Sequence, residues 1–161
     1  MSYRPELTAY RGKLLSKSTK GTAVLAGTFL RKRRIILDED LLATPRHLTR
    51  IFIHEVFHFV WSRAGNSVRA SYQELVDREF DRRARGELGW SAESMKEALT
   101  PEDRALRSKR WREYLCESFC DTGGWVFGKP GKYSERTLAP SFRKARHDWM
   151  LVTLRGGPLS I

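Results

Sequence analysis

Apolar residues surround most of one segment in the first half of the chain, between residues 45 and 63, and this pattern predicts a helix that is buried on several sides. Its apolar positions are Ile51, Phe52, Val56, Phe59 and Val60. Thr44 followed by Pro45 is typical of an N-cap and a first helical residue, and the pair Gly65–Asn66 ends the helix near its predicted boundary.

Apolar residues at helical spacing also predict a helix over residues 70–85, and Ser91 as an N-cap predicts a short helix over residues 91–99. A final helix is predicted over residues 141–154. We expect the tail from Gly156 onward to be frayed.

Between these stretches, Thr100 and Pro101 repeat the cap-plus-proline signal. They predict the start of a long helix over residues 102–122. The pair Gly123–Gly124 is interpreted as the end of that helix, unless residues 125–127 continue it after a break.

Residue types that suit β-strands concentrate in residues 21–29 and 33–37, and the basic residues 31–34 suit a turn or a charged edge. These stretches predict a small N-terminal β-hairpin or sheet. Residues 5–17 predict a short helix, although Gly12 interrupts it. The predicted fold class is therefore α+β and mostly helical.

The chain has 161 residues, of which 40% are hydrophobic, and this size suits one core and a single domain over residues 1–161. Its most apolar stretch, residues 51–61, contains three polar residues and falls short of the roughly 18 consecutive apolar residues of a membrane span. The N-terminal residues lack the apolar core of a secretory signal peptide. We therefore expect a cytoplasmic protein that does not enter the membrane.

The formal net charge of +11 favours acidic partners such as nucleic acid, an anionic surface or an acidic substrate. The basic residues are spread over residues 31–34, 82–85 and 104–112 without a recognisable nucleic-acid-binding module, so a solvated basic surface is the preferred interpretation. Cys116 and Cys120 have a spacing that suits neither a loop-closing disulfide nor a complete zinc site. They are interpreted as small buried residues.

The sequence His54-Glu55-Val56-Phe57-His58 is an HExxH motif inside the first predicted helix. Four residues advance an α-helix by about 6 Å and about 40° past a full turn, so both imidazoles project from one face and can bind one ion. Neutral histidine is a good ligand for Zn²⁺. Glu55 is displaced by about 100° from His54, which places it beside the open coordination position as a general base for a water molecule.

A catalytic zinc site usually has three protein ligands, so one more is expected. Glu113, Glu117 and Asp121 recur every four residues on a later helix, and their apolar neighbours favour a bound cation over a solvated acidic face. His47 lies about two turns before the motif and is too distant for the same ion. His147 remains a further candidate.

With these residues the chain resembles the gluzincin class of zinc metallopeptidases, in which HExxH precedes Glu-x-x-x-Asp or Glu-x-x-x-Glu on a later helix. Residues 117–121 match that segment. The resemblance implies that Glu117 is the third ligand and that Asp121 orients a histidine ligand. It also implies a zincin-like fold with an active-site helix and one Zn²⁺ ion.

The small size and the order of hairpin and helix are also similar to the compact ImmA/IrrE-like bacterial metallopeptidases. The likeness covers residues 33–63 and 111–127. Alignment to the E-x-x-A-N-x-F-A pattern of that group makes Glu113 the ligand instead and places Glu117 where the pattern has Asn. Glu113 is therefore kept as the alternative ligand.

The resemblance implies a zinc metallopeptidase that acts on a peptide or protein substrate, as an endopeptidase rather than an exopeptidase. Residues 21–37 are placed like the strand along which zincins pair an extended substrate. His147, Arg146 and Tyr133 are candidate oxyanion stabilisers. The alternatives are a zinc-stabilised regulatory or nucleic-acid-binding protein without proteolytic turnover, and a zinc-independent helical interaction domain.

Overall fold

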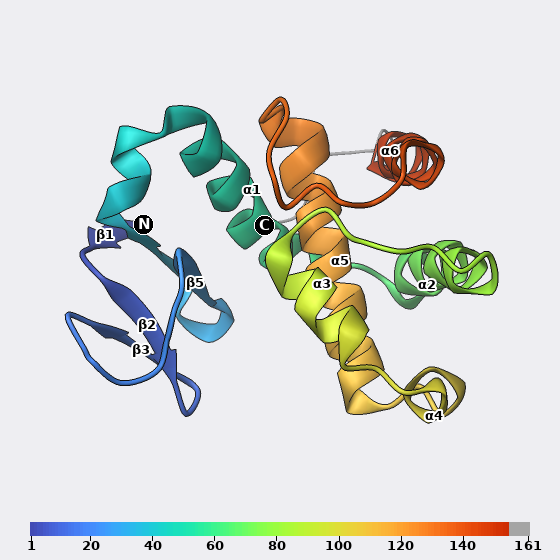
Figure 1. Cartoon of the computed structure of the whole chain (residues 1–161), viewed down its shortest axis with the longest axis horizontal. Coiled ribbons are helices and arrows are strands. Elements are labelled where there is room, and N and C mark those ends of the chain that lie inside the picture. Colours follow the sequence, from blue (N-terminus) through green and yellow to red (C-terminus); the bar gives the residue numbers. More distant parts are fainter. Residues whose placement is uncertain (155–161) are drawn as a thin grey trace.

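Residues 1–154 are described by a computed structural model, in which six α-helices follow two small β-sheets. Figure 1 shows the sheets on one side of helix α1 (Pro45–Arg63) and the remaining helices on the other. The predicted mostly helical α+β fold class is therefore confirmed. That residues 1–161 form one domain stays a prediction, and the expectation for the tail from Gly156 lies outside the described residues.

The first sheet has the strand order β1 (Ser2–Arg4), β6 (Arg34–Asp38) and β5 (Ala26–Phe29). β1 runs parallel to β6, and β5 runs antiparallel to it. The predicted hairpin is thus confirmed for β5 and β6, with the short 3₁₀ helix η1 (Leu30–Lys32) between them. β5 is an edge strand, so one side of its backbone has no strand partner within this sheet.

The second sheet has the order β3 (Lys13–Ser16), β2 (Leu7–Tyr10) and β4 (Thr22–Ala23). The prediction of a helix over residues 5–17 is therefore wrong. Tyr10 pairs with Lys13 across a two-residue turn, in which Arg11 has φ 47° and Gly12 has φ 73°. Two central residues with positive φ form the tight hairpin turn that matches the twist of paired strands.

Helix α1 is buried on two faces, as its apolar sequence predicted. Residues Ile35, Leu37, Leu41 and Phe59 form a core between the first sheet, the 3₁₀ helix η2 (Glu39–Ala43) and α1. On its other face, α1 makes its most extensive contact with helix α5 (Lys109–Gly128). The larger core there includes Phe57, Tyr72, Trp111 and Phe119.

The other helices are α2 (Asn66–Asp81), α3 (Trp90–Glu97), α4 (Pro101–Ala105) and α6 (Pro140–Leu154). The prediction of a single long helix over residues 102–122 is wrong, because α4 ends after one turn and α5 begins separately at Lys109. Thr100 and Asp103 form a capping box at α4, and the Ser108 side chain accepts a hydrogen bond from Trp111 N–H at the start of α5.

The interpretation of Gly123–Gly124 as a helix end is also wrong, because α5 continues through both residues. A Cβ atom on Gly124 would lie 2.9 Å from the Arg50 carbonyl oxygen and 3.4 Å from His54 Cβ, and one on Gly123 would lie 2.2 Å from the Phe57 ring. Because these two glycines have no side chain, α1 and α5 can approach each other closely. This approach sets the HExxH motif opposite the acidic residues of α5.

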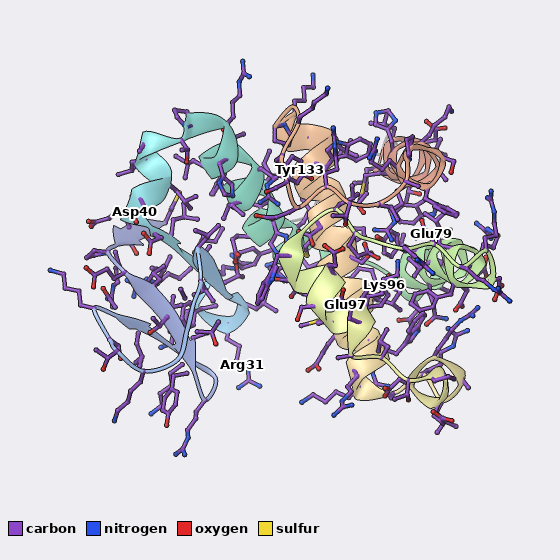
Figure 2. The ribbon with its side chains drawn as sticks, in the orientation of Figure 1. Arg31, Asp40, Glu79, Lys96, Glu97 and Tyr133 are labelled. Atoms are coloured by element: carbon purple, nitrogen blue, oxygen red, sulfur yellow. The ribbon has the colours of Figure 1, made fainter. Side chains whose placement is uncertain are left out.

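A buried ion-pair network joins the helices behind this interface. Arg146 on α6 is fully buried and donates hydrogen bonds to Glu79 on α2 and to Glu87. Lys96 on α3 and the Tyr114 hydroxyl also donate to Glu87, at 3.0 and 2.6 Å. Figure 2 labels Glu79 beside α2, on the side that faces α6, and Lys96 between α3 and α2. None of the helices in residues 1–154 is both long and apolar enough to cross a membrane.

Candidate metal centre

His54 and His58 project from the same side of α1 toward α5. Their ring centroids are 5.0 Å apart. His54 Nε2 lies 3.5 Å from Glu117 Oε2, and His58 Nε2 lies 3.8 Å from Glu117 Oε1. The structure therefore brings together two imidazole nitrogens and one carboxylate, with donor atoms within 4.8 Å of one another.

The second ring nitrogen of His54 faces Asp121, one helical turn after Glu117. His54 Nδ1 lies 2.9 Å from Asp121 Oδ1, and because a carboxylate only accepts, Nδ1 carries the proton and Nε2 is directed at Glu117. Burial alone would lower the pKa of His54, but Asp121 and then Glu117 hold this pKa well above its usual value. The two carboxylates thus favour positive charge at His54.

Glu117 itself is placed as an anionic donor. Burial alone would raise its pKa, but the hydrogen bond and charge interaction with His54, together with the charge of His58, lower the pKa of Glu117 below its usual value. Asp121 Oδ2 is buried without a hydrogen-bond partner among residues 1–154. Buried carboxylates of this kind need a neighbouring cation, which either a protonated His54 or a metal ion bound by the two histidines would supply.

The second ring nitrogen of His58 faces the thiols of Cys116 and Cys120. From the sequence these two cysteines were interpreted only as small buried residues. Cys116 Sγ lies 3.6 Å and Cys120 Sγ 3.5 Å from His58 Nδ1. Cys120 is buried and Cys116 is half-buried, and both are free cysteines. Their spacing of four residues, flanking Glu117 on one helix, was the available signal for a shared role.

Two overlapping sets of donors therefore share His58. The first is His54, His58 and Glu117, and the second is His58, Cys116 and Cys120. A neutral imidazole has one lone pair, so His58 serves the first set through Nε2 or the second through Nδ1. In the first set both Nδ1 atoms have their own partners, an arrangement typical of zinc-binding histidines, and its three donors fit a catalytic zinc ion.

The carboxylate of Glu55 lies on the sheet side of this centre. Glu55 is 7% exposed, and its Oε2 accepts a hydrogen bond of 2.6 Å from the Thr28 hydroxyl on β5. The Thr28 hydroxyl is also 3.1 Å from the Glu55 carbonyl oxygen. No local sequence pattern links Thr28 to the motif, because only the packing of β5 against α1 brings them together.

A cleft of about 290 Å³ opens beside the motif. It is lined by His54, Glu55 and Asp121, by residues 23–26 leading into β5, and by Trp90, which is 60% exposed. Arg50 and Glu135 line the same cleft, and they form an ion pair of 2.8 Å. The cleft therefore gives solvent access to the side of the motif that carries Glu55.

The remaining residues singled out from the sequence lie apart from the three donors. Glu113 is exposed and pairs with Lys109 at 3.5 Å. His147 on α6 contacts Asp148 and the Trp125 ring, and it does not line the cleft. The Tyr133 hydroxyl donates to the Leu88 carbonyl oxygen at 2.8 Å. This arrangement gives no support to oxyanion stabilisation by His147 or Tyr133 or to metal binding by Glu113.

No protein-family model, no curated protein and no solved structure gives a significant match to the chain. Its function is therefore inferred from the geometry of the site.

Proposed function

We propose that the chain is a zinc metallopeptidase, in which His54, His58 and Glu117 hold one Zn²⁺ ion. The observation that carries the proposal is the convergence of both Nε2 atoms on the two oxygens of Glu117, at 3.5 and 3.8 Å. When bound, zinc would polarise a scissile carbonyl and lower the pKa of a water molecule. Asp121 orients the His54 ring for this role through its bond to Nδ1.

Glu55 is the proposed general base. It lies next to His54 on α1, lines the cleft and is held by the Thr28 hydroxyl. A carboxylate in this position accepts the proton of the attacking water and delivers it to the leaving amine. A purely structural zinc site has no use for such a group and is usually closed by four protein ligands.

The cleft supports an extended peptide as substrate. Edge strand β5 offers unpaired backbone groups, and the residues before it line the cleft, so a substrate can pair along this edge. Among the described residues, Arg50 is the only Lys or Arg lining the cleft, and its pairing with Glu135 leaves it engaged rather than ready for a terminal carboxylate. This favours an endopeptidase. We expect it to act on cytoplasmic peptides or proteins.

The proposal is tested by zinc analysis and proteolysis with matched variants. The purified protein should contain one zinc ion and cleave denatured casein or a mixture of quenched fluorescent peptides. Glu55→Gln should keep the zinc and lower kcat by at least about 100-fold. Glu117→Gln should lose zinc, whereas Glu113→Gln, one turn earlier on the same helix, should keep both zinc and activity. A zinc-free protein, or full turnover by Glu55→Gln, would contradict the proposal.

A second candidate function is a zinc-stabilised regulatory protein without turnover. The proximity of Cys116 and Cys120 to His58 favours it, because thiolates are typical ligands of structural zinc. Under this alternative, the double variant Cys116→Ser/Cys120→Ser loses zinc and Glu117→Gln keeps it. Under the peptidase proposal the outcomes are reversed, so the two variants distinguish the functions.

A further inference from the structure

The excess of positive charge is concentrated in the N-terminal β-sheets. Residues 1–38 contain nine Lys and Arg and only two acidic residues, Glu6 and Asp38, a formal charge of +7 out of the total of +11. The other 123 residues contain 21 Lys and Arg and 17 acidic residues. About a quarter of the chain therefore carries most of the net charge.

These nine cations are not neutralised by the fold. All nine are exposed, and none forms an ion pair with another residue in positions 1–154. Asp38 is buried and accepts hydrogen bonds from the backbone of Leu7 and Asp40, which leaves Glu6 as the only exposed acid of this region. In the helical part some cations are paired, as Arg104 is with Asp77 and Asp81, whereas others such as Arg78 and Arg110 are exposed and form no ion pair within residues 1–154.

Eight of the nine cations stand at or beside three turns, which we call the basic turns. They are Arg11 between β2 and β3 with Lys13 at the start of β3, Lys17 and Lys20 between β3 and β4, and Arg31, Lys32 and Arg33 between β5 and β6 with Arg34 at the start of β6. The two sheets touch where Leu14 Cδ2 lies 3.2 Å from the point that a Cβ atom added to Gly27 would occupy, so the turns belong to one packed unit. Within it, Lys17 lies beside Glu6, at the end of the β2–β3 hairpin opposite Arg11. Figure 2 shows Arg31 at the lower edge of this unit, directed away from the ribbon.

We propose that the basic turns form a binding surface for the phosphate backbone of duplex nucleic acid. Unpaired Lys and Arg side chains bind phosphates and release the condensed counterions, which gives sequence-independent affinity. The turn of the β2–β3 hairpin presents two of these cations, Arg11 and Lys13, to solvent. This surface is a second function of the chain and does not depend on the proposed peptidase activity.

Two features favour a duplex over other polyanions. The aromatic side chains of residues 1–38, Tyr3, Tyr10 and Phe29, are half-buried, so this surface offers no fully exposed ring on which the bases of a single strand could stack. The cations stand on turns of small sheets and not along one face of an amphipathic helix, which is the usual arrangement for lying on an anionic membrane. Backbone contacts to a duplex therefore fit the surface best.

The test is fluorescence anisotropy with two labelled DNA duplexes of unrelated sequence, a single strand of equal length and vesicles of anionic phospholipid. The basic-turn variant carries Arg11→Gln, Lys13→Gln, Arg31→Gln and Lys32→Gln. It should bind both duplexes at least about tenfold more weakly than the unaltered chain. The logarithm of the association constant falls linearly with the logarithm of the salt concentration, and this slope should become shallower by about 0.9 for each phosphate that the variant no longer neutralises. A second variant, Lys17→Gln/Lys20→Gln, tests another turn in the same way.

The matched control removes the same charge from exposed, unpaired cations of the helical part. It carries Arg78→Gln, Arg83→Gln, Arg85→Gln and Arg110→Gln. The control should retain duplex affinity, and Glu55→Gln should bind duplex like the unaltered chain whatever its peptidase activity. Equal weakening in the control, unchanged binding by both basic-turn variants with native thermal unfolding, or preference for vesicles or single strands over duplex would overturn the proposal.

Discussion

Asp121 and His54 are held together across the α1–α5 interface, with Asp121 Oδ1 2.9 Å from His54 Nδ1. Asp121 lies one helical turn after Glu117, which faces the other ring nitrogen of the same histidine. Two carboxylates on one face of α5 therefore contact the two ring nitrogens of His54. This relationship defines which nitrogen of His54 is left for a metal ion, and it leads to the first two predictions.

Replacing Asp121 with Ala should weaken zinc binding by about 10- to 100-fold, because the His54 ring loses the group that orients it and raises its basicity. Asp121→Asn keeps an oxygen acceptor but removes the charge, so an intermediate effect is expected. Zinc affinity is measured by competition with a chromophoric chelator, and Asp148→Asn on the exposed side of α6 is the control. Wild-type affinity in Asp121→Ala would contradict the assigned role.

Gly89 should be required for the position of Asp121. A Cβ atom on Gly89 would lie 2.2 Å from Asp121 Oδ1 and 2.4 Å from Oδ2, so Gly89→Ala must displace the carboxylate or the backbone. We expect Gly89→Ala to reduce zinc affinity in the same direction as Asp121→Ala. Gly65→Ala is the control, because the nearest atom to its added Cβ is 3.9 Å away. Equal zinc affinities for the two glycine variants would count against this interpretation.

The Thr28 hydroxyl should position Glu55 for proton transfer. Thr28→Val keeps the shape of the side chain but removes the donor to Glu55 Oε2, whereas Thr28→Ser keeps a hydroxyl. We expect kcat to fall about tenfold in Thr28→Val, equivalent to about 1.4 kcal/mol, with unchanged zinc content and with recovery in Thr28→Ser. Loss of zinc in Thr28→Val would instead indicate a general disturbance of the site.

Arg146 should be essential for stability. Its side chain is fully buried between Glu79 and Glu87, so Arg146→Met leaves two buried carboxylates without their main partner. Removing one partner of a buried ion pair typically costs about 3–5 kcal/mol. The free energy of unfolding, measured by urea titration, should fall by this amount, whereas Lys144→Met on the exposed face of α6 should change it by less than about 1 kcal/mol.

The same network should make the fold sensitive to acid. Burial alone would raise the pKa of Glu87, but Arg146, Lys96 and Tyr114 together lower it from 4.5 to about 2. Because the folded pKa is the lower one, the stabilisation is present above pH 4.5 and is lost as the pH falls from there toward 2. Urea titrations across this range should show a smaller decline for Glu87→Gln than for the unaltered chain. Equal declines would exclude Glu87 as a contributor.

The amino-acid sequence alone was enough to set the local geometry of the motif. Thr44 and Pro45 start α1 as predicted, and four residues of helix are sufficient to put His54 and His58 on one face. The β5–β6 hairpin follows equally from short-range pattern. These features depend on helical and strand periodicity, which is a property of neighbouring residues.

Prediction from local periodicity was wrong where the same short-range pattern is compatible with two structures. Residues 7–16 carry spaced apolar side chains, yet the turn at Arg11 and Gly12 pairs them as strands. Gly123 and Gly124 end many helices, but here they lie inside α5, because α1 packs against them. In the first case the geometry of a tight turn outweighs helical preference, and in the second case tertiary packing does.

The side chains that meet the two histidines became known from the packed structure. Glu113, Glu117 and Asp121 share one helical stripe, and the stripe alone does not say where α1 crosses it. Close approach at Gly124 sets that crossing, so that Glu117 and Asp121 face the motif while Glu113 is exposed. The proximity of Cys116 and Cys120 to His58 arises from the same crossing. A helix specifies which residues share a face, but the partner of that face is chosen by the packing of distant parts of the chain.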